Sequence, residues 1–412
     1  MQFEKTARPI LLGLLALVLL VPVASAQEMP IPENVTQLAD PNLNAEGLPL
    51  GSFRLYPKLL ILGGYDTNIL ATENSTIEAG RTTVLPSVLV ESQWSRHELS
   101  FATFLESRLY PYESQENYLD WGFGSKGRLD IKDTTNLGGS INYQRLTEDR
   151  SGIDALTQAP DPSQYGQFDV NAVFNHTFDQ LTASLGASYT NLDYLEDNQS
   201  FRNRGLTRGT ARLGYIFSPG YSVFAQGTVN NRDYFNRDTR IAGNPYQDST
   251  GYDIGAGISS TLTNLITGEL WVGYLEQYYT SSVFKDVKGV SFGANVTWFA
   301  TPLTTVNIHG GREVVDATTG TAGGIFYSTA GLDIEHDVLD DLVLNAGFEY
   351  YNGDYIGISR DDDGWRVNAG VLYMLNRYVG VEVNYTYDNR DSNVAGQSFD
   401  RNQVDFGFEF QL

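Results

Sequence analysis

Residues 404–412 (VDFGFEFQL) alternate strictly between apolar and small or polar side chains up to the carboxyl terminus. The apolar positions of this segment are Val404, Phe406, Phe408, Phe410 and Leu412. Successive side chains of a β-strand point to opposite faces, so the segment has one apolar face and one polar face. A closed barrel in lipid requires this pattern, because one face of each strand meets hydrocarbon and the other meets a watery interior. The alternative is an edge strand of a soluble β-sandwich.

The same alternation recurs from residue 53 onward in units of roughly 40 residues, each with a strand, a tight turn, a second strand and a longer polar loop. Tight turns are predicted at residues 95–96, 132–133, 179–180, 218–220, 263–264, 301–302, 340–341 and 376–377. Longer loops are predicted at residues 71–80, 148–164, 197–201, 236–247, 316–324 and 391–397. Short connections at one end and long ones at the other are typical of outer-membrane barrels.

These turns, with a first strand at residues 53–66 and a last at 404–412, predict an all-β fold. The expected architecture is a transmembrane antiparallel up-and-down barrel of about 18 strands, with 16 as the alternative. Beyond residue 23 there is no apolar run of the ~18 residues that a membrane-spanning helix requires. The sequence therefore excludes a helical membrane protein.

The amino-terminal part divides into two segments ahead of the barrel. Residues 1–26 combine a positively charged start, an apolar core and an Ala-Ser-Ala end, which is the pattern of a secretory signal peptide. Residues 27–52 are rich in proline, which disfavours regular ladder pairing, and are predicted to form a periplasmic tail. The barrel is then expected to comprise residues 53–412.

The composition restricts the chemistry that the chain can perform. It has no Cys and a net charge of -23, so disulfides and thiolate sites are excluded and nucleic acid is disfavoured as a partner. Its four His residues show no metal-ligand spacing, and no GxSxG motif is present. Residues 361–364 (DDDG) are predicted to be a solvated loop rather than a cation site. We therefore predict no catalytic residue, no metal and no cofactor.

A barrel of this size cannot be filled by its own side chains, so a water-filled lumen is expected. Strand parity predicts a basic ladder on the lumen face, formed by Arg202, Arg204, Arg208, Arg212 and Arg232. It also predicts lumen carboxylates at Asp120, Asp169, Asp333, Glu335, Glu382, Asp405 and Glu409. Separated patches of opposite charge would create a transverse field that orders polar solutes. The alternative is that each arginine pairs with a neighbouring carboxylate and stiffens the wall.

Three segments carry a resemblance to a known family. Residues 63–69 (GGYDTNI), 94–99 (WSRHEL) and 143–150 (YQRLTEDR) resemble the β-barrel porin family of proteobacterial outer membranes. The resemblance extends over the whole predicted barrel. It implies a location in the outer membrane of a Gram-negative bacterium. The last strand separately resembles the terminal signature of outer-membrane proteins, so Phe406, Phe408, Phe410 and Leu412 are expected to form the signal for membrane insertion.

The resemblance also shapes the expected function and partners. Members of the family often look like parts of exopolysaccharide or capsule export systems, so passive passage of polysaccharide is the leading expectation. The alternatives are a general diffusion porin for small polar solutes and a plugged structural or surface-binding barrel. Expected partners are outer-membrane lipid, the barrel-insertion machinery and periplasmic polysaccharide-export components.

Overall fold

The structure, a computed structural model, describes residues 42–156, 161–260 and 265–412. The predicted signal peptide, the beginning of the predicted tail and the predicted turn at residues 263–264 lie outside the described residues. Within the described ranges, 19 strands form one antiparallel sheet. They are β1 (Leu48–Leu50), β2 (Phe53–Asp66), β3 (Ala79–Ser92), β4 (Glu98–Leu109), β5 (Tyr118–Lys132), β6 (Thr135–Thr147), β7 (Gln164–Phe178), β8 (Leu181–Tyr194), β9 (Arg204–Ser218), β10 (Tyr221–Tyr234), β11 (Ser249–Ser260), β12 (Ile266–Tyr279), β13 (Val287–Thr301), β14 (Thr304–Asp316), β15 (Gly324–Leu339), β16 (Leu342–Tyr355), β17 (Arg360–Asn376), β18 (Val379–Ser392) and β19 (Phe399–Gln411).

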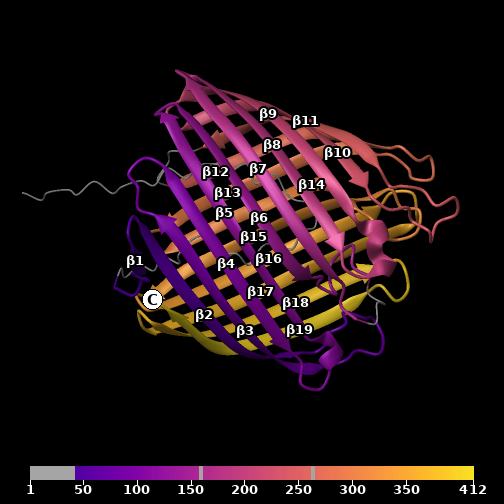
Figure 1. Cartoon of the computed structure of the whole chain (residues 1–412), viewed down its shortest axis with the longest axis horizontal. Helices are drawn as coiled ribbons and strands as arrows, with labels where there is room; N and C mark the ends of the chain where they lie inside the picture. The colour runs from indigo at the N-terminus through magenta and orange to yellow at the C-terminus, as the bar shows by residue number, and fades with distance from the viewer. Residues whose placement is uncertain (1–41, 157–160, 261–264) are drawn as a thin grey trace, which may run out of the picture.

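The sheet closes on itself because the last strand pairs with β2, from Gln411 opposite Lys58 to Gln403 opposite Asp66. Each strand from β2 to β19 pairs with its neighbours in sequence, so these 18 of the 19 described strands form a closed barrel (Figure 1). Gly407 allows close approach at this seam, since a Cβ there would lie 1.9 Å from the carbonyl oxygen of Ile61. The predicted fold and strand number are confirmed.

The connections are short at one end of the barrel and long at the other. In the described part of the chain, the long connections are residues 67–78, 110–117, 148–156 with 161–163, 195–203, 235–248, 280–286, 317–323, 356–359 and 393–398. They gather at the right-hand end in Figure 1, whereas the carboxyl terminus and β1 lie at the left-hand end. The sequence analysis missed the loops at residues 110–117, 280–286 and 356–359.

Residues 361–364 were predicted to be a solvated loop, and this prediction is wrong. They belong to β17, which pairs through them with β16 and β18. Asp361 and Asp363 point outward and are exposed, whereas Asp362 points inward, is fully buried and pairs with Arg360 at 2.6 Å. The alternation therefore continues through a run of like charges because the middle carboxylate is neutralised inside the barrel.

The outer face of the barrel carries the apolar positions of the alternation. Phe406, Phe408, Phe410 and Leu412 are between 39% and 51% exposed, whereas the intervening Glu409 and Gln411 are buried on the inner face. Exposed aromatic residues also occur near strand ends, among them Trp298, Phe217 and Trp365. Large apolar side chains facing outward around the wall are the pattern expected where each strand meets hydrocarbon.

The described end of the tail is docked on the barrel rim. β1 pairs with the start of β2, and the Gly47 N–H donates to the carbonyl oxygen of Leu412 at 3.0 Å, so β1 continues the edge of the sheet beyond the end of β19. Pro49 lies within this strand, so the expectation that prolines would prevent pairing is wrong for β1, which is an edge strand and tolerates a missing N–H. Leu43 packs against Val343 and Met374.

Helical structure is confined to short segments in the loops. The described residues contain two 3-10 helices, η1 (Ser114–Glu116) and η2 (Asp197–Arg202). No helix within these residues has the length and apolar character needed to cross a membrane.

Candidate functional site: an inward loop in the lumen

The connection between β6 and β7, which we call the inward loop, is described at residues 148–156 and 161–163. Its described part contacts strands that are not neighbours of β6 or β7 in the sheet. The contacts are made by Tyr355 and Arg390, which face inward and are buried near the long-loop ends of β16 and β18, so the loop crosses the interior of the barrel there. The inward loop therefore extends into the lumen and reaches the opposite wall.

Two side chains of the opposite wall donate three hydrogen bonds to backbone carbonyls of the inward loop. Tyr355 Oη of β16 donates to Ile153 O at 2.6 Å. Arg390 Nη2 of β18 donates to Ser151 O at 2.6 Å and to Gly152 O at 3.0 Å. These contacts satisfy buried carbonyl groups that would otherwise be costly to remove from water. They fix the path of residues 151–153 along the wall.

The next residue of the inward loop is anchored to the β14–β15 connection. The Thr318 N–H donates to Asp154 Oδ1 at 2.6 Å, and Thr318 Oγ1 donates to Asp154 O at 3.0 Å. Arg202 of η2 forms ion pairs with two carboxylates of the loop, Asp154 at 3.4 Å and Glu148 at 2.5 Å. Burial raises the pKa of Asp154 to about 6, although the charge of Arg202 opposes this shift. The carboxyl group of Asp154, which anchors the loop, therefore changes its protonation state close to neutral pH.

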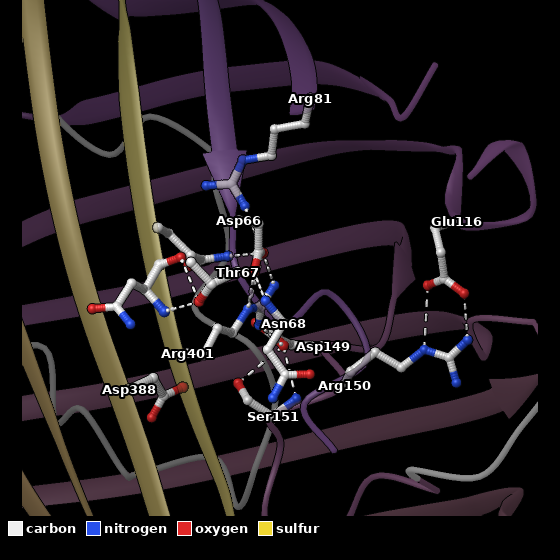
Figure 2. A network of polar contacts seen from close by, with 12 residues as sticks. Asp66, Thr67, Asn68, Arg81, Glu116, Asp149, Arg150, Ser151, Asp388 and Arg401 are labelled. Carbon is white, nitrogen blue, oxygen red and sulfur yellow. Dashed lines mark hydrogen bonds and ion pairs between the residues drawn. The ribbon is translucent and has the colours of Figure 1, made fainter. Parts of the chain in front are cut away.

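An ionic network ties the inward loop to the seam of the barrel (Figure 2). Asp66, at the end of β2, is fully buried and accepts from Arg401 Nη2 at 2.7 Å and from Arg81 Nη1 at 3.2 Å. Arg401 Nη1 also donates to Asp149 of the inward loop at 3.1 Å. Burial would raise the pKa of Asp149, but the charge of Arg401 and the N–H of Ser151 outweigh it and hold that pKa below its ordinary value.

The predicted basic ladder occupies the interior, and its members have carboxylate neighbours. Arg204 and Arg232 both pair with Asp316 of β14, at 2.7 and 2.8 Å, and β14 is not a neighbour of β9 or β10 in the sheet. Arg212 pairs with Glu269 at 2.8 Å. The remaining ladder positions are Arg208, which interacts electrostatically with Glu313, and Arg202, which lies in η2 rather than on a strand and pairs with Glu148. Each of these arginines therefore has an acidic partner, as the alternative predicted, but the partners of Arg204, Arg232 and Arg202 lie on a distant strand or in the inward loop rather than beside them in the wall.

The predicted lumen carboxylates are distributed around the wall rather than gathered in one site. Asp405 pairs with Arg81 at 2.6 Å, Glu409 pairs with Lys58 at 2.9 Å, and Asp333 lies 3.3 Å from His309. Three more carboxylates accept hydrogen bonds from neutral side chains. Thr147 donates to Asp120, Thr190 and Gln167 donate to Asp169, and Asn384 donates to Glu382. Glu335 is exposed. Sequence parity did not single out the most connected carboxylates, Asp66, Asp149, Asp154, Asp316 and Asp362. The arginine partners of the first four are distant in the sequence, whereas Asp362 pairs with Arg360 two residues away.

The half of the lumen toward the short turns is polar and accessible to water. The side chains of Asp333 and Lys58 are 50% and 37% exposed, and His309 is 36% exposed. In the described parts of the chain, no group of three or more His, Asp or Glu side chains has an arrangement that could hold a metal ion. This half therefore forms a polar, water-accessible chamber, which the inward loop borders on the side of the long loops.

The chain is similar to known outer-membrane proteins both in sequence and in structure. A family model described as "Putative beta-barrel porin 2" matches residues 40–412. Among solved structures, OpdL of Pseudomonas aeruginosa is similar at 12% identity and a TM-score of 0.44, over 88% of this chain and 100% of that one. OccAB4 of Acinetobacter baumannii is similar at 11% identity and 0.44, over 90% and 100%. A BenF-like porin from Pseudomonas fluorescens is similar at 10% identity and 0.46, over 88% and 100%.

The comparison with curated proteins found no match. The family model nevertheless spans every barrel strand from β2 to β19. The chain therefore belongs to the β-barrel porin family of that model and is a porin of the Gram-negative outer membrane.

Proposed function

We propose that this porin is a diffusion channel for small polar solutes. The observation that carries the proposal is the inward loop, which stands across a polar, water-accessible lumen and is anchored to the opposite wall at Ile153, Ser151 and Asp154. A loop fixed in this way limits the cross-section of anything that passes. Hydrated small solutes suit the polar chamber because its wall groups can replace part of their hydration.

Polysaccharide export was the leading expectation from the sequence, and it receives no support from the family match. Sugar rings bind by stacking on exposed aromatic faces, but two inward aromatic side chains of this lumen pack against each other instead. Tyr327 and Tyr351 contact each other with ring centroids 6.0 Å apart, and the buried Tyr351 donates to the carbonyl oxygen of Asn389. The general diffusion porin therefore fits this geometry better.

Liposome swelling with sugars of increasing length tests the proposal. Purified protein in vesicles should admit monosaccharides readily and admit progressively longer oligosaccharides more slowly. The control is the same vesicles without protein. Equal rates for monosaccharides and long oligosaccharides would contradict a size-limited channel, and no entry of any sugar would contradict a channel of any kind.

A further inference from the structure

The long-loop end of the barrel is closed around its whole circumference. Inward-facing side chains near this end, from strands on every side of the barrel, are each no more than 6% exposed. They are Asp66, Arg81, Asp120, Gln144, Gln167, Arg204, Arg232, Gln277, Val315, Ile325, Asp362, Arg390 and Arg401. The accessible side chains of the opposite half show that water reaches the chamber from the short-turn side. The structure therefore has the features of a channel in a closed conformation.

Opening the channel requires a segment at the closed end to move, and the barrel strands are too strongly paired to be that segment. Each barrel strand is held on both edges by a ladder of hydrogen bonds to its neighbours. Residues 149–154 of the inward loop have no such ladder. They are held by bonds from Tyr355, Arg390, Arg401 and Thr318 and by an apolar contact set around Ile153. Two ion pairs add to these bonds, Arg150 with Glu116 of η1 and Asp154 with Arg202 of η2.

Tyr355 and Arg390 belong to the wall and Thr318 to the β14–β15 connection, and each has a contact that does not involve the inward loop. Arg390 Nε lies 3.9 Å from Asp362, Tyr355 Oη donates to Asp362 at 3.4 Å, and Thr318 O accepts from Arg240 at 2.9 Å. Tyr355 is held in the wall by its ring, which packs with Val315 and Ile325. The wall can therefore keep its shape when the inward loop leaves.

We infer that Tyr355, Arg390 and Thr318 form a releasable latch, and that undocking of residues 149–154 from this latch opens the channel and sets its size limit. The inference rests on the proposed channel function. The three latch residues are positioning residues: they act on solute only through the place where they hold the loop. A single lost hydrogen bond to a charged or buried group should raise the undocked fraction roughly tenfold.

A reversible tether tests the latch in one folded protein. The chain has no Cys, so Asp154→Cys with Thr318→Cys introduces the only thiol pair, at two residues in direct contact. Oxidation should reduce monosaccharide entry in the swelling assay to near the level of protein-free vesicles, and reduction should restore it. Each single-Cys variant should be insensitive to oxidation. A confirmed disulfide that leaves entry unchanged would overturn the latch.

Two conservative variants test the same inference without a cross-link. Tyr355→Phe and Arg390→Gln each remove bonds to the inward loop, so longer oligosaccharides should enter faster than in the unmodified protein. Tyr387→Phe and Arg312→Gln are the matched controls, since those side chains bind Asp400 and Ser328 instead. An unchanged size limit in both test variants would contradict the latch while leaving a working channel. Absence of all sugar entry would instead refute the channel function, and the latch with it.

Discussion

Substitution of Asp66 by Asn tests whether the ionic network at the seam stabilises barrel closure. The carboxylate of Asp66 is fully buried and accepts from Arg401, Arg81, Gln403 and the N–H of Asn68. Asn keeps the shape of the side chain but removes its charge and places an N–H₂ group among donors. The two arginines then remain buried with too few acceptors.

The size of the expected loss of unfolding free energy depends on the carboxylates that Arg81 and Arg401 still contact in the variant. Breaking a buried ion pair by removing one member usually costs roughly 3 to 5 kcal/mol. Arg81 keeps Asp405 and Arg401 keeps Asp149, so we expect a loss near the lower value, about 3 kcal/mol of unfolding free energy. Because Arg401 spans both carboxylates, part of this loss should appear as weaker docking of the inward loop.

Urea unfolding of the protein refolded into lipid vesicles, followed by the fluorescence of its five Trp residues, measures this difference. The matched control is Asp333→Asn, because the side chain of Asp333 is 50% exposed and should contribute less than ~1 kcal/mol. If Asp66→Asn unfolds within ~1 kcal/mol of the unmodified protein, the network does not stabilise the seam and the reasoning fails.

Three further perturbations have defined outcomes. Arg212→Gln leaves Glu269 without its cationic partner, so reversal-potential measurements should show a stronger preference for cations, and an unchanged potential would mean that Glu269 does not face the solute path. The raised pKa of Asp154, about 6, means that the docked loop takes up a proton more readily than the undocked loop. Docking should therefore strengthen as pH falls from 7 to 5, and sugar entry should decrease; an increase over this range would show that the sign is wrong. Gly407→Val places side-chain atoms against Ile61 O, so the folded, fast-migrating band on unheated gels should be largely lost; normal yield would show that the seam can shift.

Strand alternation is a local property, and it predicted the barrel well. The predicted first strand, residues 53–66, coincides with β2, and the predicted long and short connections fall at opposite ends. Side-chain parity also placed Arg204, Arg212 and Arg232 inside the barrel. Parity depends only on neighbouring residues, which is why these predictions needed no knowledge of the tertiary structure.

The interior of the site depended on contacts that the sequence does not encode locally. Arg390 reaches Ser151 from the other side of the lumen, and nothing in the residues around either position marks the pair. Arg360 neutralises the buried Asp362, so residues 361–364, which were predicted to form a loop, are part of β17. Pro49 joined β1 because that strand lies at the edge of the sheet and has a free side. The local signal was therefore overridden by a long-range contact at Arg390, by an inward ion pair two residues away at Asp362, and by an edge position at Pro49.

The central claim is that the lumen conducts solutes past an inward loop that limits their size. Single-channel recording of the purified protein in planar bilayers tests it most directly. The account predicts discrete conductance steps, which become larger or longer-lived in Arg390→Gln, because that substitution releases the loop. A correctly folded barrel that inserts into the bilayer without any conductance steps, in both the unmodified protein and this variant, would contradict it.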